Sequence, residues 1–200
     1  MTKIIIATLY EKEPVLVSAT KLGADVLYLV IDDKENAKQE DSLSLIKKSL
    51  GSVVKINTIK VSVYDIVSTA KKIVDILETL SEKDDITLNI SSGRKTQSLA
   101  LLFAAYTRIR YVNRIIYVTQ EEHKIIELPK LAFNLTESQI RLLSQINKEE
   151  HSSLVELAKK TDMSRGMLYR NLKELQDLGL IVLEKESKYR LTDAGKIARL

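Results

Sequence analysis

The stretch that decides the fold is DDITLNISSGRKTQ, residues 84–97. Its apolar residues are spaced among strand-tolerant ones, which is typical of a buried strand. Ser91-Ser92-Gly93 interrupts the strand, and the following run of Leu, Ala and Phe predicts a helix. Small residues at such a junction let backbone N–H groups approach a ligand, and the start of a helix attracts negative charge. Because Arg94 and Lys95 add positive charge, the stretch predicts a site for an anion such as a phosphate.

A purely structural interpretation of the same loop is also open. Many α/β loops use Ser and Gly only to form a tight turn and to cap a helix. The loop is not a P-loop, because its glycine spacing differs and it lacks the Lys-Ser/Thr ending of that motif, and the dinucleotide pattern GxGxxG is absent. No common nucleotide-binding motif therefore decides between the two interpretations.

Composition sets the class of protein. The chain has 200 residues, of which 44% are hydrophobic and 29% charged, as in ordinary soluble globular proteins. No apolar run reaches 18 residues, and the N-terminus enters a strand-like run directly, so we expect neither a membrane span nor a signal peptide. With no cysteine, the chain has no disulfide, thiolate zinc site or catalytic thiol. We therefore expect a cytoplasmic protein.

The net charge and the two histidines do not by themselves indicate a nucleic-acid-binding or metal-binding function. The net charge is +4, and the parts before and after residue 134 carry 19 basic with 17 acidic and 12 basic with 10 acidic residues. Each part is therefore at +2, and only the placement of charges can indicate nucleic-acid binding. His123 and His151 are far apart and have no visible metal partner, so we expect surface residues and no metal site.

The first part of the chain alternates strands and helices. This order predicts an α/β fold with a Rossmann-like, mostly parallel, doubly wound sheet of about six strands and helices on both faces. The last two strands are joined by a short connection and should be antiparallel neighbours. We expect strands near 3–8, 25–31, 53–61, 86–90, 113–119 and 124–128, and helices near 14–22, 34–50, 64–80 and 96–110.

Two loops should meet at one edge of this sheet. Ligands of doubly wound sheets bind at the carboxyl ends of the strands, where the strand order reverses. The strands at 3–8 and 86–90 are the expected central pair. Their carboxyl ends carry Thr8-Leu9-Tyr10-Glu11 and residues 91–95, one polar loop and one basic loop. Their meeting favours a pocket for a phosphate-bearing ligand.

The sequence changes character after Pro129. We expect a first domain at 1–129, a linker at 130–134 and a second domain at 135–200. In the second domain, Thr136 with Gln139 forms a capping box at the start of a helix. A second helix is expected from about Ser152 to Lys160, and a third from Ser164 to Leu178. Two short strands joined by Glu186-Ser187, and then a terminal helix, complete the pattern of a winged helix-turn-helix domain.

Geometry predicts the DNA contacts of such a domain. The third helix should lie in the major groove with its N-terminal half against the base edges. Arg165 and Arg170 are the candidates for reading bases, whereas Lys173 is expected at a phosphate. The strands and their turn would reach the backbone or the minor groove. The full set of expected DNA-binding residues is Ser164, Arg165, Tyr169, Arg170, Lys173, Lys185, Lys188 and Arg190.

Together, the loop at 89–96, the first strand ending at Thr8 and the order of the domains resemble a known family. The chain resembles the CRISPR-associated Rossmann-fold (CARF) proteins fused to a winged helix-turn-helix, which are archaeal CRISPR-associated transcriptional regulators. The resemblance implies a homodimer with one central site for a cyclic oligoadenylate, commonly cyclic tetraadenylate, and a palindromic DNA operator. It implies that the ligand is lined by Thr8, Leu9, Tyr10, Ser91, Ser92, Gly93, Arg94 and Lys95.

The resemblance also raises the question of catalysis, because some relatives cleave the ring. Ser91 and Lys95 are the weak candidates for such a reaction. Neither loop contains a histidine, so we see no general base and expect a regulator that is not an enzyme. Three alternatives stay open: a ring-cleaving nuclease, a DNA-binding sensor of a mononucleotide or dinucleotide cofactor, and an adaptor that binds protein. The operator, the sign of regulation and the ring size do not follow from the sequence.

Overall fold

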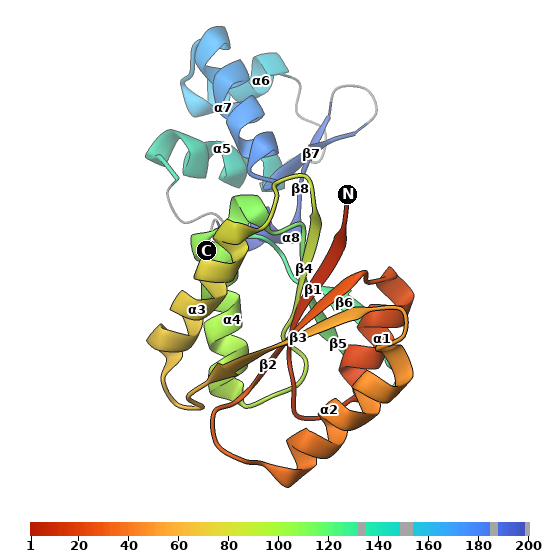
Figure 1. The fold of residues 1–200 in the computed structure, drawn as a ribbon. Coiled ribbons are helices and arrows are strands. Elements are labelled where there is room, and N and C mark those ends of the chain that lie inside the picture. Colours follow the sequence, from red (N-terminus) through yellow and green to blue (C-terminus); the bar gives the residue numbers. More distant parts are fainter. Residues whose placement is uncertain (132–134, 149–153, 185–187, 199–200) are drawn as a thin grey trace. The chain divides into compact units, whose positions relative to one another are not determined.

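The computed structural model describes residues 1–131, 135–148, 154–184 and 188–198. The chain forms two compact units, Met1–Leu128 and Pro129–Leu200. The first unit contains the large sheet, and the second contains three helices, a two-stranded sheet and a short terminal helix (Figure 1).

A six-stranded sheet forms the centre of the first unit. The strand order is β3-β2-β1-β4-β5-β6, and every neighbouring pair is parallel except β5 with β6. The predicted mostly parallel α/β sheet, its central pair and its antiparallel last pair are therefore confirmed. The strands are β1 (Lys3–Thr8), β2 (Val26–Asp32), β3 (Lys55–Val61), β4 (Asp85–Asn89), β5 (Arg114–Val118) and β6 (Ile125–Glu127).

Four α-helices cover the two faces of this sheet (Figure 1). Side chains alternate along a strand, so Ile5 and Ala7 of β1 pack with α1 and α2, whereas Ile4 and Ile6 pack with α3 and α4. Both faces are apolar, as a strand buried on both sides requires. The helices are α1 (Glu13–Leu22), α2 (Ala37–Leu50), α3 (Ile66–Thr79) and α4 (Lys95–Thr107), and α4 is followed by the short 3₁₀ helix η1 (Ile109–Tyr111).

Two helix ends differ most from the sequence prediction, by three residues each. Helix α2 begins at Ala37 rather than near residue 34, because the Asn36 side chain accepts a hydrogen bond from the Gln39 N–H at 3.2 Å and caps the helix there. Helix α4 ends at Thr107, and the turn of 3₁₀ helix occupies the residues up to Tyr111. Both differences are shifts of a boundary and leave the order of elements unchanged.

The second unit packs its helices around one apolar core. The predicted capping box is confirmed: the Thr136 N–H donates to Gln139 Oε1 at 2.9 Å, and the Gln139 N–H donates to Thr136 Oγ1 at 3.3 Å. Strands β7 and β8 are antiparallel. The expected start of the second helix at Ser152 and the turn at Glu186-Ser187 lie outside the described residues. The elements are α5 (Glu137–Lys148), α6 (Leu154–Thr161), α7 (Arg165–Asp177), β7 (Ile181–Leu183), β8 (Tyr189–Leu191) and α8 (Asp193–Ala198).

Candidate functional site

The parallel pairing of β1 with β4 brings the two predicted loops together. Ala7 lies opposite Asn89 in the register, so both strands end at the same edge of the sheet. The loop after β1 runs to the start of α1, and the loop after β4 runs to the start of α4. This edge is the place where parallel α/β sheets bind ligands.

Ser92 joins the two loops through its hydroxyl. Its Oγ accepts hydrogen bonds from the backbone N–H of Tyr10 and of Glu11, both at 2.8 Å, and donates to the Glu11 carbonyl at 3.2 Å. A serine hydroxyl offers one donor and two acceptor positions, so all three are used. Ser92 is buried. Its side chain therefore holds the β1–α1 loop in place and has no hydrogen-bonding position left for a ligand.

Ser91 is tied to the body of the unit in a similar way. Its hydroxyl donates to Asn89 Oδ1 and accepts from the Val118 N–H at 2.6 Å. The amide group of Asn89 donates in turn to the Pro14 carbonyl at 3.1 Å and to Ser18 Oγ at 2.8 Å. The loop after β4 is thus anchored to both β5 and α1. One acceptor position of the Ser91 hydroxyl remains for a donor.

The backbone of the loop turns at Gly93 against the end of β1. Gly93 has φ +84°, and a Cβ added there would lie 2.7 Å from Thr8 Cβ. The Thr8 hydroxyl donates to the Ser92 carbonyl. Thr8 and Leu9 are 1% and 0% exposed, so their side chains are buried beneath this edge and support its backbone.

Two buried glutamines, neither of them among the predicted site residues, complete the support of the site. Gln39 donates to the Leu9 carbonyl at 2.6 Å and accepts from the Asp32 N–H at 2.9 Å. Gln97 donates to Asp32 Oδ1 at 2.7 Å and accepts from the Arg94 N–H at 3.0 Å. Each glutamine stands three residues after the residue that precedes its helix, which is the spacing of a capping pair and a signal present in the sequence.

Positive charge gathers around the ring of Tyr10. Arg94 Cζ lies 5.0 Å and Lys38 Nζ 4.8 Å from the ring centre, within the range of a cation–π interaction. Lys38 also pairs with Glu11 at 2.8 Å, and this hydrogen bond raises the pKa of Lys38. Lys95, the first residue of α4, is exposed. The first N–H groups of α4 add partial positive charge at the same place.

This edge of the sheet is suited to bind an anion. Arg94, Lys95 and the start of α4 supply positive charge, and Tyr10 supplies an aromatic face. Among the residues described, no group of three His, Asp or Glu side chains could hold a metal ion. The described helices include none that is long and apolar enough to cross a membrane.

In the second unit, α7 presents a polar face. Ser164 caps the helix by accepting from the Met167 N–H at 3.2 Å. Arg165, Tyr169 and Lys173 follow at intervals of four residues and are all exposed, so they share one face. These three side chains therefore form one exposed polar surface along α7.

The other predicted DNA-binding residues are placed less uniformly. Arg170 Nε lies 3.9 Å from Glu174 Oε1, and Arg190 Nε lies 2.6 Å from Glu184 Oε1, so both cations face a carboxylate. Lys188 precedes β8 and is partly buried. Lys185 lies outside the described part of the chain.

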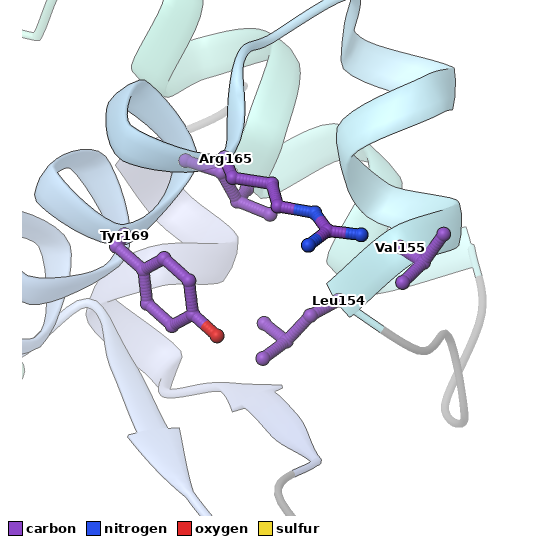
Figure 2. A pocket seen from close by; sticks show the side chains of 5 residues that line it. Leu154, Val155, Arg165 and Tyr169 are labelled. Atoms are coloured by element: carbon purple, nitrogen blue, oxygen red, sulfur yellow. The ribbon is translucent and has the colours of Figure 1, made fainter.

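A pocket of about 250 Å³ lies between α6 and the first turns of α7. Leu154, Val155 and Leu168 supply apolar walls, and Arg165 and Tyr169 bring a guanidinium and a phenol. Figure 2 shows the Arg165 side chain extending toward Val155, with the Tyr169 hydroxyl near Leu154. The pocket thus combines an apolar surface with polar groups on the exposed side of α7.

The class that the fold defines is a mostly parallel α/β domain with a cationic sheet edge, joined to a small helical unit. Residues 3–123 match the family described as HFX_2341_N-like, N-terminal, and the chain belongs to this family. Residues 134–192 match a second family description, HVO_A0114. The comparison with curated protein sequences gives no match.

Several solved structures resemble the chain. Enterococcus italicus Csm6 bound to cyclic hexa-2′-fluoro-hexa-dAMP has a TM-score of 0.58 at 16% identity, over 88% of this chain and 54% of that chain. Can2 from Sulfobacillus thermosulfidooxidans in complex with cyclic tetra-adenylate has a TM-score of 0.49 at 14% sequence identity, and the match covers 98% of this chain and 63% of that chain. The M. tuberculosis transcriptional regulator MosR has a TM-score of 0.31 at 31% sequence identity, and the match covers 32% of this chain and 50% of that chain. The chain spans less than two thirds of each of these proteins, and the likeness to Csm6 shows the fold.

Proposed function

We propose that this protein is a ligand-responsive, DNA-binding transcriptional regulator of CRISPR loci. Its first unit is a CARF domain that binds a cyclic oligoadenylate, and its second unit is a winged helix-turn-helix domain that binds a DNA operator. One observation carries the proposal: Ser92 joins the loops after β1 and β4 directly beside Arg94, Lys95 and the start of α4. Csm6, which shares the fold, was solved with a cyclic hexanucleotide, and this supports the class of ligand.

In this proposal each group at the edge of the sheet has a role toward the ligand. Arg94 and Lys95 bind phosphates together with the first N–H groups of α4. Tyr10 stacks on an adenine. Ser92, Thr8 and Gly93 fix the backbone that surrounds the ligand, and the Leu9 side chain supports it from the core.

The proposed homodimer is supported by an apolar stripe that continues from the site. Lys95, Leu99 and Phe103 follow one another at intervals of four residues along α4, so they share one face. Leu99 and Phe103 are 44% and 49% exposed, and neighbouring exposed apolar side chains of this kind are typical of protein–protein interfaces. Pairing of this stripe with its copy across a two-fold axis would bring two Lys95 side chains toward one ligand. A cyclic oligonucleotide with even symmetry matches such a site.

The DNA-binding role is supported by the second unit. Its elements have the order of a winged helix-turn-helix: three helices and then a two-stranded antiparallel sheet. The third helix is capped by Ser164 and exposes Arg165, Tyr169 and Lys173. The pocket beside Arg165 offers an apolar surface for a thymine methyl group. A dimer of such units binds a palindromic operator, and a ligand that favours one spacing of the two units changes the affinity for that operator.

Calorimetric titration with cyclic tetraadenylate and cyclic hexaadenylate tests the sensor role. We expect one ring per dimer and weaker binding after Lys95→Ala. DNA affinity is then measured with and without saturating ring at one salt concentration, because salt alone changes protein–DNA affinity strongly. If neither ring binds, the proposed ligand is wrong. If the ring binds and DNA affinity does not change, the proposed regulation is wrong.

A further inference from the structure

Helix α2 forms a third side of the anion site. Gln39 donates to the Leu9 carbonyl at 2.6 Å, and Ser42 donates to the Tyr10 carbonyl at 3.0 Å. Gln39 and Ser42 are 5% and 7% exposed, so both side chains are buried. The first two turns of α2 are therefore fixed against the loop that follows β1.

Lys38 stands at the exposed end of this contact. Its Nζ lies 2.8 Å from Glu11 Oε1 and 4.8 Å from the centre of the Tyr10 ring. Arg94 approaches the same ring from the start of α4. One cation from α2 and one from the residue that precedes α4 thus lie near the same aromatic ring. Because Gln39 anchors the adjacent position of α2, the backbone that carries Lys38 is held beside the loop after β1.

The cations near Tyr10 differ in whether a carboxylate pairs with them. Lys38 has Glu11 as its counter-ion. In the described part of the chain, neither Arg94 nor Lys95 forms an ion pair with a carboxylate. Glu11 therefore pairs with one of the cations beside Tyr10, and an arriving anion would compete with it for Lys38.

We propose that Lys38 is a further phosphate-binding residue of this site and that Glu11 is the internal counter-ion that a phosphate of the ligand displaces. The proposal deepens the proposed function, and it rests on that function for the identity of the ligand as a cyclic oligonucleotide. The Lys38 and Glu11 side chains are 55% and 43% exposed, so their ion pair is weak enough to be exchanged. The flexible four-carbon stem of the lysine lets its ammonium move from Glu11 to a phosphate.

The two residues should have opposite effects on affinity. Lys38 attracts the phosphate, so its loss weakens binding. Glu11 repels the phosphate and holds Lys38 away, so its neutralisation strengthens binding. A role of the pair in folding alone would change stability and leave affinity unchanged.

The test is calorimetric titration of the full-length protein with cyclic tetraadenylate and cyclic hexaadenylate. We expect Lys38→Met to weaken binding about tenfold, as for the loss of one charged hydrogen bond. We expect Glu11→Gln to strengthen binding about threefold, and the slope of log K against log salt to become shallower by about 0.7 in Lys38→Met. Lys48→Met is the matched control, because it removes the same charge from the last turn of α2 and should leave affinity unchanged.

A second probe separates this inference from the proposed function. Inorganic tripolyphosphate needs only the cationic group and not the nucleotide site. If neither ring binds but tripolyphosphate does, and binds more weakly to Lys38→Met, the inference stands and the proposed ligand is wrong. Equal affinities of the wild type, Lys38→Met and Lys48→Met for the anion that binds would overturn the role of Lys38. Weaker binding by Glu11→Gln would overturn the role of Glu11. Absence of binding by both probes would overturn the anion site itself.

Discussion

Thr8 and Gly93 are in such close approach that a Cβ on residue 93 would lie 2.7 Å from Thr8 Cβ. Gly93 also has φ +84°, a conformation that residues with a Cβ adopt at a cost of roughly 1–2 kcal/mol. We therefore expect Gly93→Ala to lower the free energy of unfolding by about 2–4 kcal/mol, since strain and overlap add. Urea denaturation measures this change, and ring binding should be lost or greatly weakened because the loop can no longer lie against β1.

The matched control for this substitution is Gly166→Ala. Gly166 lies in the first turn of α7, and a Cβ there would meet no atom within 4 Å. Alanine favours a helix over glycine by about 1 kcal/mol, so this variant should be as stable as the wild type or slightly more stable. Equal stability of Gly93→Ala and the wild type would contradict the close approach of Thr8.

Ser92→Ala tests the connection between the loops. The substitution removes the acceptor of the Tyr10 and Glu11 N–H groups, and a buried donor without a partner costs about 1–3 kcal/mol. We expect the amide hydrogens of both residues to exchange faster with solvent, as measured by hydrogen exchange, and the affinity for the ring to fall. Ser44→Ala, at an exposed position of α2, is the control. Unchanged exchange at residues 10 and 11 would show that Ser92 does not hold the loop.

The sheet of the first unit could be predicted from the sequence because it depends on local patterns. Runs of β-branched residues alternate with amphipathic stretches, and these patterns decide the order of elements and the parallel pairing. The meeting of the loops after β1 and β4 followed from that order. The boundary at Asn36 did not, because it depends on one side-chain hydrogen bond.

The roles of individual side chains at the site could not be predicted in the same way. Ser91 and Ser92 were expected to face the ligand, but their hydroxyls bond to Asn89, Val118 and the backbone of the β1–α1 loop. The part played by α2 depends on contacts between residues about 30 positions apart. Such contacts exist only in the folded chain, and a sequence without aligned relatives gives no direct sign of them.

Phe103→Lys tests the proposed dimer. The substitution places a charge on the exposed apolar stripe of α4, and burying an unpaired charge in an interface is strongly unfavourable. We expect a dimer for the wild type and a monomer for the variant in sedimentation analysis, with loss of tight ring binding. Ile126→Lys is the control, because Ile126 is similarly exposed, at 45%, on the edge strand β6. A monomeric wild type, or a dimer in both variants, would contradict pairing through this stripe.

Arg165→Ala and Lys173→Ala should separate the reading of bases from the binding of phosphates. Both residues lie on the exposed face of α7, Arg165 at its start and Lys173 two turns further on. With an operator obtained by selection from random DNA, we expect Arg165→Ala to cost about 1–3 kcal/mol and to relax the preference at one base pair. Lys173→Ala should weaken binding equally for all sequences and make the salt dependence shallower by about one phosphate contact.

Lys159→Ala, in the last turn of α6, removes a charge away from this face and is the control. Affinity measured against salt concentration for the operator and for a scrambled duplex distinguishes the two effects. If all three variants bind DNA as the wild type does, α7 is not the reading helix, and the second unit acts on a partner other than DNA.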